Sequence, residues 1–381
     1  MIKVRRFWAF GARAIAVATL VVPSAIAGQP VLARSPDVQS ASQQKVLPAG
    51  VISTGAIASA HPLASDAGLE MLEQGGNAVD AAVATAFAIS VVTPFSAGIG
   101  GGGFALHFEP ETGEIKALDF RERAPGAAFR ELYLDEDGKP RSRRVSLDGH
   151  LAAGVPGTVA GLAELHQKYG KLPWAQVVAP AIRLAQDGFI VSQRLSDRSQ
   201  GRLPVMRDNP AARAIFTRDG EPLPVGDRLV QRDLAATLRT VAIDPDQFYR
   251  GWIARQIAAD MVVNGGLISR QDLENYRVKW RSPLCGKFQD FRVCSMPPPS
   301  SGGVHLLQML TMLEQFPAVL DGVRSGETTS QAMANYLHVL AEVMKIAYAD
   351  RAEYLGDPDF VEVPVKALMS AGYLRERSRG I

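Results

Sequence analysis

Apolar residues recur along this chain in blocks with helical or strand spacing, separated by short segments rich in glycine and proline. The most apolar block is residues 78–92 (AVDAAVATAFAISVV), whose polar members are Asp80, Thr85 and Ser90. At about 100° per residue these three point to different sides of a helix, so no face is left for water. We therefore predict a helix over residues 78–92 that is buried in a layered core. Asn77 is its expected N-cap, and Asp80 lies in the first turn, where the helix dipole favours a carboxylate.

Other helices are predicted from the same spacing, most of them bounded by glycine or proline. An amphipathic helix over residues 64–73 ends at Gly75 and Gly76. Further predicted helices cover residues 162–169, 174–187, 232–242 and 331–354. In the last of these helices, the residues that recur at helical spacing and are expected to form its buried stripe are Met333, Leu337, Leu340, Met344 and Ala347.

The glycine cluster at residues 98–103 (GIGGGG) satisfies the G-x-G-x-x-G pattern of dinucleotide-binding sites. That pattern needs a strand before the glycines and a helix after them. Here a helix precedes, and the alternating residues 104–108 (FALHF) predict a strand afterwards. No helix N-terminus is then available for a pyrophosphate, so a Rossmann site is not predicted. We expect instead a tight bend where two backbones approach so closely that a β-carbon would not fit.

After a short turn, residues 115–122 (IKALDFRE) predict a strand that returns beside the first. Side chains alternate across a strand, so Leu118 and Phe120 share one face while Asp119 and Arg121 share the other. An arginine held beside a carboxylate near a glycine bend is suited to bind a substrate carboxylate in bidentate fashion. Taken alone, however, such a pair is more often a solvated face or a structural ion pair of little energetic weight.

Cys285 and Cys294 bracket two short predicted strands around a turn at Gln289 and Asp290. A two-residue turn places the cysteines opposite each other, with β-carbons about 4.5–5.5 Å apart, which is slightly wide for a disulfide. The pattern leaves a cross-strand disulfide and two buried thiols equally open.

Residues 295–303 (SMPPPSSGG) follow this predicted hairpin. The prolines fix an extended stretch, and Ser300, Ser301 and Gly302 offer hydroxyl and N–H groups at the entrance of a helix from Val304 onward. The segment is either a rigid loop that lines a pocket or an ordinary strand-to-helix connection, which composition favours.

Composition excludes several classes of protein. The 381 residues carry a net charge of only +2, so the chain lacks the strong positive charge typical of proteins that bind nucleic acid. Two cysteines rule out a disulfide-rich scaffold and a zinc site built from cysteine alone. The six histidines never pair at i, i+3 or i+4, so a metal site has no support, and we expect no metal and no cofactor. Serine, histidine and aspartate candidates exist, but no Gly-x-Ser-x-Gly elbow surrounds any serine. The chain therefore reads as a globular enzyme or binding protein.

The N-terminus carries the three parts of a signal peptide. Arginines and a lysine precede the short apolar run 14–22, and residues 25–27 (AIA) form a small-residue cleavage box. That apolar run is too short to span a bilayer, which needs about 20 residues, so no stable membrane anchor is expected. We predict a signal peptide over residues 1–27, a linker over 28–48, and a periplasmic or secreted protein.

Several segments, in order, resemble the large-subunit motifs of γ-glutamyltransferases (glutathione hydrolases). These segments are residues 58–65 (ASAHPLAS), 75–82 (GGNAVDAA), 98–104 (GIGGGGF), 119–122 (DFRE), 154–161 (GVPGTVAG), 296–303 (MPPPSSGG) and 347–351 (AYADR). The resemblance implies that residues 49–381 are a large-subunit region. It also implies the α/β fold of N-terminal-nucleophile hydrolases, a four-layer αββα sandwich that is incomplete without the small subunit.

The resemblance implies γ-glutamyl transfer to water, amino acids or peptides, with glutathione and other γ-glutamyl compounds as substrates. Arg121, in the DFRE motif, would bind the α-carboxylate of the substrate, because its fork suits a carboxylate. We add Asp119, Ser300, Ser301 and Gly302 as residues expected to line the pocket. The nucleophile would be a threonine whose own α-amine acts as base, and whose attack forms an acyl-enzyme.

That threonine opens the small subunit of the family, and we find no matching context for it in this chain. We therefore expect the nucleophile beyond Ile381, on a small subunit that is the partner of this chain. The chain alone is then expected to be inactive. Two alternatives stay open, a relative of the cephalosporin and glutaryl acylases and a non-catalytic remnant.

Overall fold

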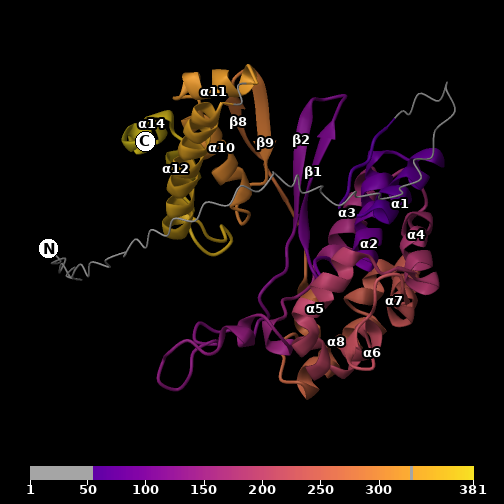
Figure 1. Ribbon diagram of the computed structural model, residues 1–381. Coiled ribbons are helices and arrows are strands. Elements are labelled where there is room, and N and C mark those ends of the chain that lie inside the picture. The colour runs from indigo at the N-terminus through magenta and orange to yellow at the C-terminus, as the bar shows by residue number, and fades with distance from the viewer. Residues whose placement is uncertain (1–54, 327–328) are drawn as a thin grey trace, which may run out of the picture. The chain divides into compact units, whose positions relative to one another are not determined.

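The computed structural model describes residues 55–326 and 329–381 (Figure 1). The predicted signal peptide and linker lie outside the described residues, and they stay predictions together with the domain boundaries. The helices are α1 (Pro62–Glu73), α2 (Ala78–Val92), α3 (Thr158–Tyr169), α4 (Trp174–Asp187), α5 (Gln193–Asp208), α6 (Pro210–Phe216), α7 (Arg232–Ile243), α8 (Trp252–Val263), α9 (Arg270–Asn275), α10 (Gly302–Leu313), α11 (Pro317–Arg324), α12 (Ser330–Tyr354), α13 (Val365–Leu368) and α14 (Ala371–Arg377).

The strands are β1 (Gly103–Glu109), β2 (Glu114–Phe120), β3 (Phe189–Ile190), β4 (Thr217–Arg218), β5 (Glu221–Pro222), β6 (Arg228–Leu229), β7 (Lys279–Arg281), β8 (Leu284–Phe288) and β9 (Phe291–Ser295). Four short 3₁₀ turns lie at Arg143–Ser146, His150–Ala152, Pro245–Phe248 and Ser378–Gly380. Two groups of buried side chains result, one around α2 and one around α10 and α12.

Helix α2 is buried along most of its surface, whereas the sequence predicts no exposed face. Ala78 and Ala82 are exposed, and Thr85, Ala86 and Ile89 on the same side are half-buried. Both α1 and α4 pack against α2, and its side chains Val83, Phe87 and Val91 are fully buried. The predicted N-cap is confirmed, because Asn77 Oδ1 accepts hydrogen bonds from the N–H groups of Val79 (2.9 Å) and Asp80 (3.1 Å). Asp80 Oδ2 accepts in return from the N–H of Asn77, at 2.8 Å. This reciprocal capping box defines where α2 begins.

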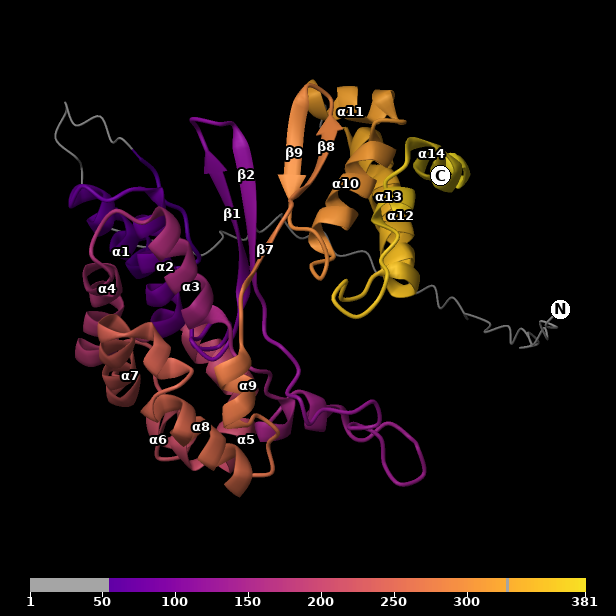
Figure 2. The same ribbon diagram turned by 180° about the vertical axis from the view of Figure 1, so that it is seen from behind.

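Strands β1 and β2 form an antiparallel pair, and β7 adds to the free side of β2 (Figure 2). Helix α3 packs against β1 and β2, and Leu118 and Phe120 of β2 are buried in the first core. On β1, Leu106 and Phe108 are exposed. The sheet thus covers the first core and leaves an apolar surface on β1.

The glycine cluster forms the predicted bend between α2 and β1. A β-carbon on Gly102 would lie 2.5 Å from the carbonyl oxygen of Phe120, and one on Gly157 would lie 2.0 Å from that same oxygen. The N–H groups of Gly157 and Thr158 donate to the carbonyl of Gly101, at 2.7 and 3.0 Å. Three backbone segments therefore meet at distances that exclude any side chain, which confirms the predicted close approach.

The second core lies under the hairpin β8–β9. Helix α10 packs against both strands and against α12 and α14. The fully or nearly buried apolar side chains of this core are Met312, Leu313, Val339, Val343 and Leu374.

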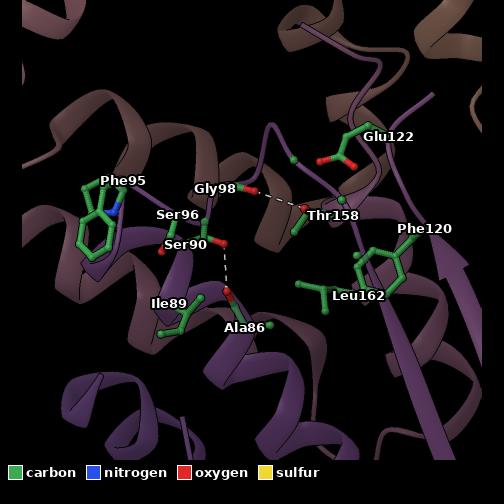
Figure 3. Close-up of a pocket in the computed structure, with 15 residues that line it drawn as sticks. Ala86, Ile89, Ser90, Phe95, Ser96, Gly98, Phe120, Glu122, Thr158 and Leu162 are labelled. Atoms are coloured by element: carbon green, nitrogen blue, oxygen red, sulfur yellow. Dashed lines mark hydrogen bonds between the residues drawn. The ribbon is translucent and has the colours of Figure 1, made fainter. Parts of the chain in front are cut away.

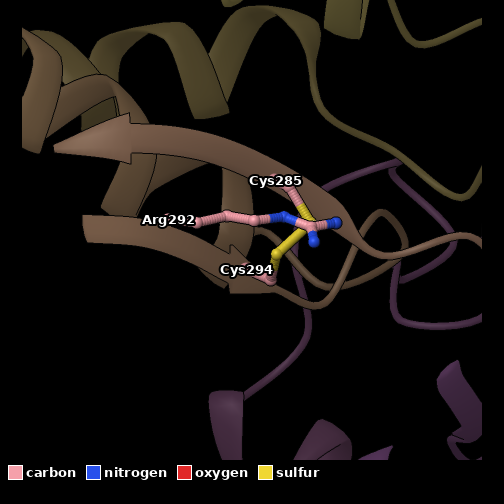
Figure 4. Close-up of a disulfide and its surroundings, with 3 residues drawn as sticks. All are labelled: Cys285, Arg292 and Cys294. Carbon is pink, nitrogen blue, oxygen red and sulfur yellow. A yellow bond between two sulfur atoms is a disulfide. The ribbon is translucent and has the colours of Figure 1, made fainter. Parts of the chain in front are cut away.

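In this hairpin Cys285 is paired directly opposite Cys294, and a disulfide joins the two residues (Figure 4). The turn lies at Gln289 and Asp290, as predicted, and Gln289 has a φ of +54°. Of the two possibilities left open by the sequence, the structure contains the disulfide.

We therefore expect the purified chain to resist alkylation by iodoacetamide until it is reduced. Intact mass should rise on reduction by the mass of two hydrogens, because the cross-strand register brings both sulfur atoms together. A native chain that takes up two alkyl groups without reductant would contradict the disulfide.

Most of the residues predicted to form the buried stripe of α12 are not buried. Three of them, Met333, Leu337 and Met344, are exposed. The buried residues of α12 are Val339, Val343, Ala347 and Asp350. Helices α10 and α11 pack against α12, whereas the described residues leave the side with the predicted stripe open. Spacing alone could not indicate which of two apolar faces of this helix is covered.

Candidate functional site

A cavity of about 490 Å³ brings together three of the predicted site residues, Arg121, Ser300 and Ser301. Its other lining residues are Pro299, Tyr348, Arg351, Ala352, Leu355 and Gly356. The volume falls within the range of small-molecule sites. Segments far apart in the sequence therefore build one candidate site.

Arg121 enters this cavity from the end of β2. The strand ends at Phe120, so Arg121 follows the strand and does not continue it, in contrast to the prediction. Its backbone is held on both sides, because its N–H donates to Asp119 Oδ1 (3.0 Å) and its carbonyl accepts from the hydroxyl of Tyr276 (2.9 Å). The guanidinium carbon lies 6.0 Å from the ring centroid of Phe104. Among the described residues, no carboxylate forms an ion pair with Arg121.

Asp119 has a different role from the one predicted. Its side chain is 7% exposed and is not among the residues that line the cavity. Asp119 Oδ2 accepts a hydrogen bond from Nε of Arg281 on β7, at 2.8 Å. Arg281 also pairs with Asp359, at 3.2 Å. The carboxylate therefore ties strands β2 and β7 to the segment after α12, and it fixes the backbone of Arg121 instead of pairing with its guanidinium.

The proline-serine loop forms one wall of the cavity, through Pro299, Ser300 and Ser301. Ser300 Oγ accepts a hydrogen bond from the N–H of Gly302, at 3.2 Å. Gly302 begins α10 and is not a lining residue. Ser301 precedes the helix without capping it through its side chain. Of the two interpretations of this loop, the pocket-lining one is supported for the serines.

Tyr348 and Arg351 of α12 also line the cavity. Tyr348 is packed against His305 of α10, with ring centroids 4.9 Å apart. The Arg351 guanidinium lies 6.0 Å from the centroid of the Tyr348 ring. Burial, assisted by the positive charge of Arg351, lowers the pKa of His305 and favours a neutral imidazole. We did not single out Tyr348 or Arg351 from the sequence, although both belong to the AYADR motif.

Asp350 anchors this part of α12. Its side chain is 2% exposed and accepts hydrogen bonds from Gln308 (2.9 Å), Tyr373 (2.8 Å) and Arg377 (3.0 Å). These partners lie on α10 and α14, so the buried carboxylate joins three helices. Because Asp350 is fixed, the next residue, Arg351, is presented to the cavity.

A second cavity, of about 550 Å³, lies beside the glycine bend (Figure 3). Phe120 and Glu122 line it, whereas Arg121 between them lines the first cavity. Two of its hydroxyls are already bonded to backbone carbonyls, Thr158 to Gly98 at 3.2 Å and Ser90 to Ala86 at 2.9 Å, while Ser96 and the carboxylate of Glu122 also line it. This second cavity contains no arginine or lysine, so the positively charged groups that suit a carboxylate lie in the first cavity.

The chemistry that the first cavity can perform is binding of anions. Its lining contains two arginines and three hydroxyl groups, but no aspartate, glutamate, histidine or lysine. A general base for activating a serine is therefore absent from this lining. Across residues 55–326 and 329–381, we find no group of three or more histidine, cysteine or acidic side chains placed to hold a metal ion. Within that same part of the chain, no helix is both long and apolar enough to cross a bilayer.

Comparison with known proteins gives consistent matches. The family model described as Gamma-glutamyltranspeptidase matches residues 64–381. The glutathione hydrolase proenzyme of Escherichia coli (strain K12) is 47% identical over 324 residues, covering 84% of this chain and 54% of the relative. The acylase ACY 1 proenzyme of Pseudomonas sp. (strain SE83) is 41% identical, covering 85% of this chain and 58% of that relative.

Solved structures agree with these matches. The Helicobacter pylori gamma-glutamyltranspeptidase superposes with a TM-score of 0.80 at 42% identity, covering 86% of this chain and 91% of that chain. The predicted fold class is thereby confirmed. The chain spans about half the length of the curated relatives it matches.

Proposed function

This chain belongs to the gamma-glutamyltranspeptidase family, and we propose from that premise that it is the large-subunit region of a glutathione hydrolase. The observation that carries the proposal is Arg121, which lies in the cavity without a carboxylate partner among the described residues. A planar, permanently charged fork in such a place suits the α-carboxylate of a γ-glutamyl group. The serine hydroxyls of the proline-serine loop would add polar contacts.

The nucleophile in this proposal is a threonine on a small subunit. The lining of the cavity supports this assignment, because it offers hydroxyl groups without a base. It also lacks a carboxylate for the ammonium group of a γ-glutamyl substrate, so we assign that contact to the same small subunit. The acceptors would be water, amino acids or peptides, and the predicted signal peptide would direct the protein to the periplasm or the medium.

The test is the release of p-nitroaniline from γ-glutamyl-p-nitroanilide. We expect no release by this chain alone. Release is expected after co-expression with the part of the E. coli glutathione hydrolase proenzyme that lies beyond its match to this chain. Turnover by this chain alone would contradict the assignment of the nucleophile. A co-purified complex that binds substrate but does not turn it over would contradict the proposed activity.

An acylase is the second candidate, because the acylase ACY 1 proenzyme is 41% identical to this chain. Glutaryl-p-nitroanilide differs from the γ-glutamyl compound only in lacking the α-amino group. Both compounds present a carboxylate to Arg121, so comparing their turnover by the same complex separates the two functions. We expect the γ-glutamyl compound to be preferred, and preference for the glutaryl compound would favour the acylase.

A further inference from the structure

The cavity that contains Arg121 holds a second guanidinium, which the γ-glutamyl group does not need. Arg351, on α12, lines the same cavity as Arg121 and the proline-serine loop. Arg121 and Arg351 both lack an ion-pair partner among the described residues. The lining contains no acidic side chain, so two positive charges share one cavity without a counter-charge. Such an arrangement attracts anions and favours a ligand with more than one negative group.

Arg351 is held in place by its neighbours. Its guanidinium lies 6.0 Å from the centroid of the Tyr348 ring, within the range of a cation–π contact. Tyr348 is packed in turn against His305, which is 7% exposed. The preceding residue, Asp350, is buried and hydrogen-bonded to α10 and α14. The side chain therefore starts from a fixed backbone and is supported by an aromatic ring.

We propose that Arg351 forms a second carboxylate subsite, which binds the carboxylate of the leaving group of a γ-glutamyl peptide. The inference rests on the proposed function, because it takes Arg121 as the group that binds the α-carboxylate. The preferred donors are then γ-glutamyl peptides with a free C-terminal carboxylate, whereas γ-glutamyl amides with a neutral leaving group use Arg121 alone. A cavity of about 490 Å³ is large enough for a ligand of this size.

The first experiment uses the chain itself and needs no turnover. Phenylglyoxal modifies accessible guanidinium groups, and peptide mass mapping measures the rate at each arginine. Both cavity arginines are exposed and should react, and Arg255, which is exposed on α8 outside the cavity, serves as the reference. The ligands are γ-glutamyl-p-nitroanilide, which has one carboxylate, and S-methylglutathione, which has a second carboxylate at its C-terminus.

We expect γ-glutamyl-p-nitroanilide to slow modification of Arg121 and to leave Arg351 unchanged. S-methylglutathione should slow both, while Arg255 reacts at a constant rate. Protection of Arg121 but equal reactivity of Arg351 with both ligands would overturn the second subsite and leave the proposed function standing. Equal protection of both arginines by the nitroanilide would mean that both bind the α-carboxylate. That result would also overturn the second subsite. Protection of neither arginine by either ligand would overturn this inference, whereas the proposed function is tested separately by turnover in the active complex.

The second experiment measures kinetics in the active complex described above. Arg351→Gln should raise KM for glutathione about tenfold, the loss expected for one partly exposed charge-assisted contact. KM for γ-glutamyl-p-nitroanilide should stay within about twofold of the unmodified value. Arg351→Lys, which keeps the charge, should restore part of the loss for glutathione. An equal rise in KM for both substrates would indicate a merely structural role and contradict the subsite.

Discussion

Replacing Asp80 by alanine is expected to lower the free energy of unfolding by about 3–5 kcal/mol, because three N–H groups lose a fully buried carboxylate as their acceptor. The Asp80 side chain is 0% exposed. It accepts from the N–H groups of Asn77 (2.8 Å), Lys171 (3.0 Å) and Leu172 (3.2 Å). One carboxylate thus caps α2 and fixes the loop between α3 and α4. A loss of this size would remove much of the roughly 5–15 kcal/mol that stabilises a typical domain.

Urea unfolding followed by circular dichroism measures this loss. Asp66→Ala is the matched control, because Asp66 is an exposed carboxylate on the neighbouring helix α1, and a change within about 0.5 kcal/mol is expected there. Asp80→Asn keeps the shape and one acceptor oxygen, so its loss should lie between the two. Similar stability of the Asp80→Ala and Asp66→Ala variants would contradict a structural role for the Asp80 hydrogen bonds.

The sequence could predict Asp80 as part of α2 because that information is local. The helix period, the cap at Asn77 and the absence of a polar face all lie within sixteen neighbouring residues. The contacts of Asp80 with Lys171 and Leu172 cross more than ninety residues, and no pattern in the sequence indicated them. Local patterns therefore predict helix α2. Only the structure shows the distant hydrogen-bond partners that make Asp80 important for stability.

The candidate site divides in the same way. Arg121, Ser300 and Ser301 could be proposed from motifs, but the cavity that unites them depends on how distant segments meet. Asp119 was assigned to the pocket because it neighbours Arg121 along the strand. The guanidinium that binds its carboxylate belongs instead to Arg281. Arg281 is 162 residues away in the sequence, so the pattern of a single strand could not indicate this contact.

Arg351 shows why one wall of the cavity was missed. The spacing of apolar residues placed the buried face of α12 on Met333, Leu337, Leu340, Met344 and Ala347. Of these, only Ala347 is buried and only Leu340 packs against the second core. The helix is instead rotated so that Val343 and Asp350 face the core. With the wrong face buried, the positions of Tyr348 and Arg351 could not be deduced. The buried Asp350 has three hydrogen-bond partners and stabilises this rotation of the helix, since leaving a charge unpaired in the core would be costly.

Replacing Arg121 by alanine is expected to lower kcat/KM for γ-glutamyl-p-nitroanilide by about 10²–10³-fold in the active complex. Removing one partner of a hydrogen-bonded charge pair costs about 2–5 kcal/mol, and each 1.36 kcal/mol corresponds to tenfold. Arg121→Lys keeps the charge but loses the planar fork, so it should restore part of the activity. The backbone contacts of Arg121 with Asp119 and Tyr276 do not involve its side chain, so both variants should fold normally.

Arg123→Ala is the matched control for this loss. Arg123 lies two residues further along the same segment, with its guanidinium carbon 5.7 Å from the ring centroid of Tyr276, and it does not line the cavity. We expect its kcat/KM to stay within about threefold of the unmodified complex, a difference of less than 1 kcal/mol. Thermal unfolding of all three variants shows whether the fold is retained. If Arg121→Ala and Arg123→Ala lose activity equally while remaining folded, Arg121 does not bind the α-carboxylate, and the proposed function loses its main support.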